Sequence, residues 1–138
     1  MKILFMCVAN SARSQLAEGL ARTVLPFAEI RSAGSQPSQL NPFAVAVMKE
    51  IGIDISKHYS KDIVELESTF LDELDYVITL CAEEVCPVVV SKAKKLHWPF
   101  PDPATKEILA DSEQTQMFRI TRDAILLKIK EFEQALVR

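Results

Sequence analysis

KILFMC, Lys2–Cys7, is followed at once in the chain by VANSARS, residues 8–14. An uninterrupted apolar run of this kind is typical of a strand that is buried on both faces of a parallel sheet. The polar loop after it leads into apolar residues at helical spacing, which predicts a helix over residues 14–25. A buried strand, a short loop and a helix in this order predict an α/β fold.

The rest of the chain continues this alternation of strands and helices. Asn41 as N-cap and Pro42 as first helical residue predict a helix start, with Val45, Met48 and Ile51 expected to face the core. The remaining predicted elements are strands over 28–32, 75–80 and 95–98, a loop over 53–67, a short helix over 82–93 and an amphipathic helix over 112–137. Together they predict a three-layer α/β/α fold around a four-stranded parallel sheet.

Length and composition limit the classes of protein that fit. The 138 residues, 49% hydrophobic and 25% charged, predict one folded domain over 1–138. A net charge of −3 is the opposite of what a nucleic-acid-binding protein normally carries. No apolar run is long enough to span a membrane, and the apolar start is too short for a signal peptide. We therefore expect a cytoplasmic monomer without a nucleic-acid or membrane partner.

The strongest chemical signal is a cysteine and an arginine separated by five residues, between a buried strand and a helix. Successive N–H groups of such a loop can point inward and bind an anion, helped by the helix N-terminus. Arg13 adds a planar fork that suits a tetrahedral oxyanion, and Ser14 can donate a hydrogen bond to the Cys7 thiolate. Asn10 can adopt the left-handed conformation that a tight loop needs. The predicted oxyanion-binding residues are Val8, Ala9, Asn10, Ser11, Ala12 and Arg13.

Asp102 stands between Pro101 and Pro103, so its carboxylate is held on a stiff loop. Such an aspartate can be a general acid that protonates a leaving oxygen, or merely a turn residue. Cys7, in turn, can be a small buried hydrophobic residue rather than a nucleophile. The strand–loop–helix context and the presence of both residues favour catalysis, because strand ends of one parallel sheet converge at one edge.

Cys81 and Cys86 form a second cysteine pair, five positions apart. A disulfide between them requires Cα atoms within about 7 Å, and two buried inert thiols are the plain alternative. A zinc site needs four ligands, for which only Cys7, His58 and His97 remain, so no metal is predicted. Cys81 follows a predicted strand at the same sheet edge as Cys7, which favours a redox pair.

These motifs together resemble those of the thioredoxin-coupled arsenate reductases, which share the low-molecular-weight protein tyrosine phosphatase fold. The resemblance covers almost the whole chain. It is carried by the loop of residues 7–14 with 15–19 after it, Ser32-Ala33-Gly34, Asn41-Pro42, residues 77–81, Cys86-Pro87, His97-Trp98 and Asp102-Pro103-Ala104.

The resemblance implies a mechanism. Arsenate, with phosphate or sulfate as competing oxyanions, would bind in the loop against Arg13. Cys7 would attack arsenic while Asp102 protonates the departing oxygen. Cys81 would then attack Cys7 and release arsenite, and Cys86 would attack Cys81. External thioredoxin would reduce the resulting disulfide, and no tightly bound cofactor is implied.

Some members of this family bind potassium beside the loop, with residues that correspond to Asn10, Glu18, Ser32 and an acid. Lys61 stands where the acid would be, so an ammonium group can replace the cation. We therefore expect that potassium is not required. The chain also has Ala9 where family loops usually carry glycine, and Ala12 where some relatives carry a further cysteine.

Two alternative functions use the same residues. A low-molecular-weight tyrosine phosphatase would use Cys7, Arg13 and Asp102 with water as the second nucleophile. Phosphatases of this fold usually place aromatic residues after the Asp-Pro pair, whereas Ala104 and Thr105 follow here. A non-enzymatic oxyanion or arsenite sensor would use the three thiols without turnover. A glutaredoxin–glutathione system is the alternative to thioredoxin as reductant.

Overall fold

A four-stranded parallel sheet forms the centre of the computed structural model, which describes residues 1–82, 88–89, 91–104 and 109–136. Its strands are β1 (Lys2–Cys7), β2 (Glu29–Gly34), β3 (Tyr76–Thr79) and β4 (Lys94–His97), in the order β2-β1-β3-β4. The predicted fold class is therefore confirmed. Of the short helix expected over 82–93, residues 83–87 and 90 lie outside the described residues. The described residues 82, 88–89 and 91–93 are not helical, so the prediction was wrong there, and the β-branched Val88 and Val89 disfavour a helix.

The central strand β1 is buried on both faces, as its apolar sequence predicts. Ile3 and Phe5 pack into one hydrophobic cluster, and Leu4 and Met6 pack into the other. This alternation follows from the two-residue period of a strand. β1 therefore supplies side chains to both cores of the three-layer fold.

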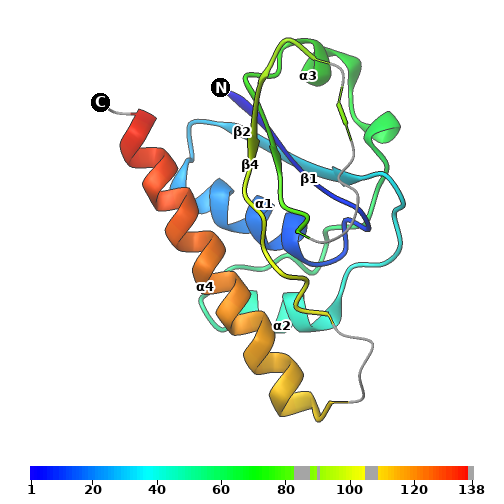
Figure 1. Cartoon of the computed structure of the whole chain (residues 1–138), viewed down its shortest axis with the longest axis vertical. Coiled ribbons are helices and arrows are strands. Elements are labelled where there is room, and N and C mark those ends of the chain that lie inside the picture. The colour runs from blue at the N-terminus through cyan, green and yellow to red at the C-terminus, as the bar shows by residue number, and fades with distance from the viewer. Residues whose placement is uncertain (83–87, 90, 105–108, 137–138) are drawn as a thin grey trace.

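Helices cover the two faces unequally. The larger cluster lies under α1 (Arg13–Val24), α2 (Pro42–Lys49) and α4 (Asp111–Leu136), and α4 packs along both other helices (Figure 1). The smaller cluster is covered by the short helix η1 (Ile63–Glu65) and by α3 (Ser68–Asp72). A loop was expected over residues 53–67. The helix η1 lies inside this range, and α3 begins directly after it.

The start of α2 is as predicted, but its buried side differs. The Asn41 side chain accepts a hydrogen bond from the Phe43 N–H at 2.9 Å, and Pro42 is the first helical residue. Met48 is fully buried, whereas Ile51 is 42% exposed, so the prediction for Ile51 was wrong. The helix ends at Lys49, and Ile51 therefore lies in the turn after it, outside the buried stripe.

Trp98 anchors the loop that carries Asp102. Its ring packs between Phe5 of β1, at 6.1 Å between centroids, and Phe132 of α4, at 5.7 Å. Its backbone N–H donates to the Thr79 carbonyl at 2.8 Å, which extends the pairing of β3 and β4. The proline-rich loop therefore leaves the sheet from a fixed point.

No helix in the described parts of the chain is long and apolar enough to cross a membrane.

Candidate active site

The loop between β1 and α1 has the tight shape that its sequence predicts. Asn10 has φ of 49°, in the left-handed region, as expected. Gly34 at the end of β2 pairs with Cys7, and a Cβ on Gly34 would lie 2.4 Å from the Val8 carbonyl oxygen and 2.9 Å from the Asn10 nitrogen. Only glycine at position 34 therefore lets β2 approach the loop so closely.

Cys7 lies at the foot of this loop, 3% exposed, as a free thiol. The Asn10 backbone N–H donates to its Sγ at 3.2 Å, and the Ser14 Oγ lies 2.9 Å from the same sulfur. The Asn10 side-chain amide donates to the Ser14 Oγ at 2.7 Å, so the Ser14 hydroxyl hydrogen is available to the sulfur. The Asn10 N–H and the Ser14 hydroxyl thus both face the Cys7 sulfur.

A pocket of about 140 Å³ opens above the sulfur. The residues that line it come from the loop, from the segment after β2 and from the proline-rich loop: Cys7, Ala9, Ser11, Ala12, Arg13, Ser38, Asp102 and Ala104. The pocket is small and has the Arg13 guanidinium on its wall, which suits an oxyanion better than a large organic ligand. Of the predicted oxyanion-binding residues, Val8 and Asn10 do not line the pocket. Asn10 instead contacts the Cys7 sulfur through its backbone N–H.

Arg13 joins the two sides of this pocket. Its guanidinium is buried and donates to the Phe100 carbonyl at 2.9 Å, while its Nη2 lies 3.8 Å from the Asp102 Oδ2. The Asp102 side chain is 48% exposed, and its Oδ1 accepts a hydrogen bond from the Ala104 N–H at 3.0 Å. The structure therefore places a carboxylate at the mouth of the pocket and a guanidinium at its wall.

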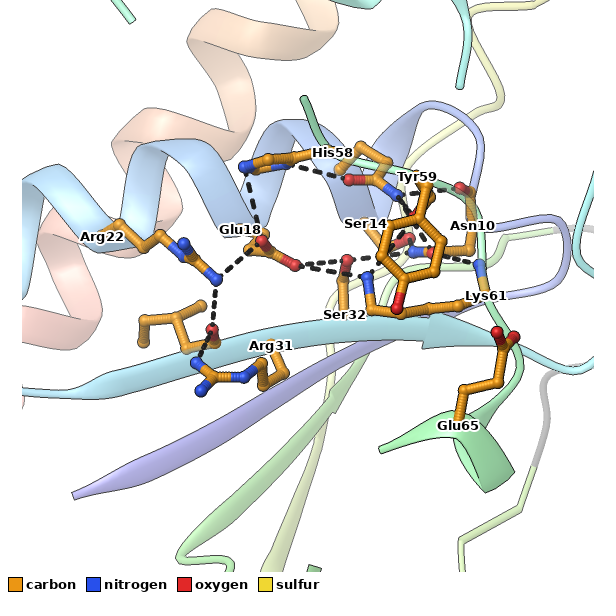
Figure 2. A network of polar contacts seen from close by, with 12 residues as sticks. Asn10, Ser14, Glu18, Arg22, Arg31, Ser32, His58, Tyr59, Lys61 and Glu65 are labelled. Atoms are coloured by element: carbon orange, nitrogen blue, oxygen red, sulfur yellow. Dashed lines mark hydrogen bonds and ion pairs between the residues drawn. The ribbon is translucent and has the colours of Figure 1, made fainter. Parts of the chain in front are cut away.

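A chain of hydrogen bonds continues behind the loop to a buried carboxylate (Figure 2). The Asn10 side-chain amide donates to the Ser32 Oγ at 3.0 Å, and the Ser32 hydroxyl donates to Glu18 at 2.7 Å. Glu18 is 2% exposed and has the Arg22 guanidinium at 3.0 Å. The conformation of Asn10 is thus tied to a charged group in the interior.

His58 and Lys61 lie against the same carboxylate. The His58 Nε2 is 3.5 Å and the Lys61 Nζ 4.0 Å from Glu18. Burial lowers the pKa of both His58 and Lys61, and the negative charge of Glu18 opposes that shift. The Lys61 ammonium accordingly lies beside the Asn10, Glu18 and Ser32 group, where the resemblance puts it. In the part of the chain that the structure describes, no group of three or more His, Cys, Asp or Glu residues could hold a metal ion.

Cys81 lies two residues after β3, the strand that pairs with β1 beside Cys7. It is fully buried and disulfide-bonded. The preceding residue, Leu80, donates its N–H to the Met6 carbonyl at 2.9 Å, so the backbone leading to Cys81 runs beside the end of β1. Cys86 lies outside the described residues.

The residues predicted for the site fall into two groups. Cys7, Arg13 and Asp102 line one pocket, and the Ser14 Oγ contacts the Cys7 sulfur at its foot, whereas Cys81 is buried two residues after β3. Sequence reasoning missed Ser38, which lines the pocket, and Ser60, whose Oγ donates to the Ala9 carbonyl at 2.6 Å. Neither residue belongs to a local motif, because both reach the loop from distant parts of the chain.

The sequence matches the family described as low molecular weight phosphotyrosine protein phosphatase over residues 2–138. An arsenate reductase of Halalkalibacterium halodurans is 43% identical over 135 residues, covering 96% of this chain and 94% of the relative. An arsenate reductase of Bacillus subtilis is 42% identical over 135 residues, with the same two coverages.

Solved structures of arsenate reductases share the fold of this chain. An arsenate reductase in the phosphate binding state superposes with a TM-score of 0.75 at 31% identity, over 96% of each chain. A thioredoxin-dependent arsenate reductase of Corynebacterium glutamicum superposes with a TM-score of 0.70 at 27% identity, over 97% of this chain and 60% of that one.

Proposed function

Because this chain belongs to the low molecular weight phosphotyrosine protein phosphatase family, and its relatives described above are arsenate reductases, we propose that it reduces arsenate to arsenite. The observation that carries the proposal is the position of the Cys7 sulfur, at the foot of an oxyanion-sized pocket with Arg13 on its wall and Asp102 at its mouth. The relatives named arsenate reductases, at over 40% identity, favour arsenate over a phosphate ester as the substrate.

Arsenate binds as a tetrahedral oxyanion in the loop of residues 8–13. Backbone N–H groups of the loop and the Arg13 guanidinium hold its oxygens. Phosphate and sulfate have the same shape and charge, so they compete for the pocket. The Ser14 hydroxyl and the Asn10 N–H hold the Cys7 sulfur at the foot of the pocket, where it faces the bound oxyanion.

The first chemical step forms a bond between the Cys7 sulfur and arsenic. The bond from arsenic to a hydroxyl group of the arsenate breaks, and the carboxylic acid of Asp102 gives its proton to that hydroxyl, which leaves as water. The half-exposed position of Asp102 lets it regain a proton from solvent. The product of this step is an arsenic(V) adduct on Cys7.

The second step reduces arsenic. The Cys81 thiolate attacks the Cys7 sulfur, the electron pair of the sulfur–arsenic bond stays on arsenic, and arsenite leaves as arsenic(III). Cys86 then attacks Cys81, which frees the Cys7 thiolate and leaves a disulfide between Cys81 and Cys86.

Thioredoxin completes the cycle by reducing the disulfide through its own dithiol. The thioredoxin-dependent neighbour from Corynebacterium glutamicum supports this choice over glutaredoxin and glutathione. The reaction needs no tightly bound cofactor, and the Lys61 ammonium beside Glu18 makes potassium unnecessary. The cytoplasm, where thioredoxin keeps thiols reduced, is the compartment that fits this chemistry.

Arsenate-dependent oxidation of NADPH, coupled through thioredoxin and its reductase, tests the proposal. The wild-type protein is expected to turn over, and Cys7→Ser, Cys81→Ser and Cys86→Ser each to stop turnover. Cys81→Ser should still hydrolyse an aryl phosphate, since that reaction needs only Cys7, Arg13 and Asp102. Arsenate reduction that persists in Cys7→Ser, or wild type that hydrolyses phosphate esters without reducing arsenate, would refute it.

A further inference from the structure

The peptide between Ala9 and Asn10 is held from both sides, and we propose that Ser60 is the residue that positions it. The proposal deepens the function proposed above and rests on it, because the peptide faces the Cys7 sulfur. Ser60 has no contact with the pocket and is not among its lining residues. Its role is to fix a backbone group that does face the sulfur.

The carbonyl oxygen and the N–H of this peptide each have hydrogen-bond partners, and these partners lie on opposite sides of the peptide. The Ser60 Oγ donates to the Ala9 carbonyl oxygen at 2.6 Å, and the Ser38 N–H donates to the same oxygen at 3.2 Å and to the Ser60 Oγ at 2.9 Å. On the other edge, the Asn10 N–H donates to the Cys7 sulfur at 3.2 Å. In a planar trans peptide the C=O and N–H point in opposite directions, so holding the oxygen outward aims the N–H at the sulfur.

The local backbone by itself favours a different orientation of this peptide. Asn10 has φ of 49°, a conformation that L-residues adopt at a cost. A half-turn of the Ala9–Asn10 peptide would carry this φ into the ordinary extended region. The same half-turn would point the Ala9 carbonyl oxygen at the Cys7 thiolate, where it would repel the sulfur and any bound oxyanion. The hydrogen bond from Ser60 opposes that rotation.

Ser60 is itself held by its neighbours in sequence. The Tyr59 carbonyl accepts a hydrogen bond from the Gln15 side chain at 3.0 Å, and the Lys61 N–H donates to the Asn10 side-chain oxygen at 3.0 Å. Figure 2 shows Tyr59 and Lys61 lying close to Asn10. Residues 59–61 therefore form a brace against the loop, with the Ser60 hydroxyl at its centre. Through this brace, a segment far from the cysteines in sequence sets the donor that faces Cys7.

The test measures how readily Cys7 is alkylated by iodoacetamide as pH is varied, in wild type, Ser60→Ala, Ser60→Thr and Ser56→Ala. Tryptic cleavage after Lys2 and Arg13 gives a peptide in which Cys7 is the only cysteine, so mass spectrometry reads this thiol alone. Ser56 lies in the same segment, is exposed and contacts Asp54 instead of the loop, which makes it the matched control.

Ser60→Ala is expected to move the midpoint of the alkylation profile to higher pH. At neutral pH its rate should fall about three- to tenfold, the factor that corresponds to one hydrogen bond. Ser60→Thr keeps the hydroxyl and should restore the wild-type profile, and Ser56→Ala should match wild type. A purely structural role would change thermal stability without moving this midpoint.

An unchanged midpoint in Ser60→Ala would overturn the proposal, and so would a Ser60→Ala variant that does not fold, since Ser60 would then serve the fold as a whole. The assay uses no arsenate, so the two proposals fail separately. A shifted midpoint in a protein that never reduces arsenate refutes only the proposed function. Arsenate turnover with an unshifted midpoint refutes only the role of Ser60.

Discussion

The hydroxyl oxygen of Ser14 lies 2.9 Å from the sulfur of Cys7. Because the Asn10 amide already donates to that oxygen, the Ser14 hydroxyl can direct its own hydrogen at the sulfur. Ser14 belongs to the first turn of α1, whose N-terminal N–H groups face the same loop. The nucleophile is thus stabilised by a side chain whose position follows directly from the start of a helix.

Ser14→Ala should therefore leave Cys7 less reactive near neutral pH. A hydrogen bond to a charged group is the strong kind, so the rate of Cys7 alkylation should fall about ten- to a hundredfold. At high pH, where wild type and variant are both fully thiolate, the two rates should converge. A variant with the wild-type rate at every pH would show that Ser14 does not stabilise the thiolate.

Gly34→Ala should displace the loop of residues 8–13, because β2 packs directly against it at Gly34. The added Cβ would lie 2.4 Å from the Val8 carbonyl oxygen, so the loop or β2 must shift, at a cost of about 1–3 kcal/mol in the free energy of unfolding. The displacement should also slow Cys7 alkylation, because the Asn10 N–H moves with the loop. Urea unfolding and the alkylation assay measure the two effects.

Gly52→Ala is the comparison for that experiment. Gly52 has φ of 80° with open space around its Cα, so alanine there is strained by backbone conformation alone. It should lower stability but leave the reactivity of Cys7 unchanged. Equal alkylation rates in Gly34→Ala and Gly52→Ala would mean that the close approach of β2 does not shape the loop.

His58 should make stability depend on pH. Burial lowers its pKa below the usual 6.5, so between these two values the unfolded chain binds more protons than the folded one. Stability is therefore expected to fall as pH drops through about 6.5, and His58→Gln should flatten that part of the curve. Melting temperature followed by circular dichroism gives the slope, with the exposed His97→Gln as control. The same slope in wild type and His58→Gln would contradict this expectation.

Arsenate turnover should not depend on potassium. The Lys61 ammonium lies 4.0 Å from the Glu18 carboxylate and already supplies positive charge there. Rates in potassium, sodium and choline chloride at equal ionic strength should agree. A rate raised strongly and specifically by potassium would show that Lys61 does not replace the cation.

Much of the fold could be predicted because its signals are local. The apolar run of β1 and the Asn41-Pro42 cap are each readable from a few neighbouring residues, and both are confirmed. The meeting of Cys7 and Asp102 at one pocket also follows from the rule that parallel strands end at a common edge. Local pattern and sheet geometry thus lead to the same part of the molecule.

The residues that were missed act across long sequence distances. Ser60 reaches Ala9 through a segment without periodic pattern, and the approach of Gly34 to Val8 depends on how closely two strands pack. The short helix η1 could have been found, because its Asp62 and Glu65 form a capping box. Tertiary contacts of single polar side chains leave no comparable trace in one sequence.

Trp98, whose ring packs between Phe5 and Phe132, is the sole tryptophan of the chain. Its intrinsic fluorescence therefore reports on one known location, four residues before Asp102. Any rearrangement of the proline-rich loop or of α4 during an encounter with an oxyanion should alter that emission. The protein carries its own optical probe, and stopped-flow experiments need no added label.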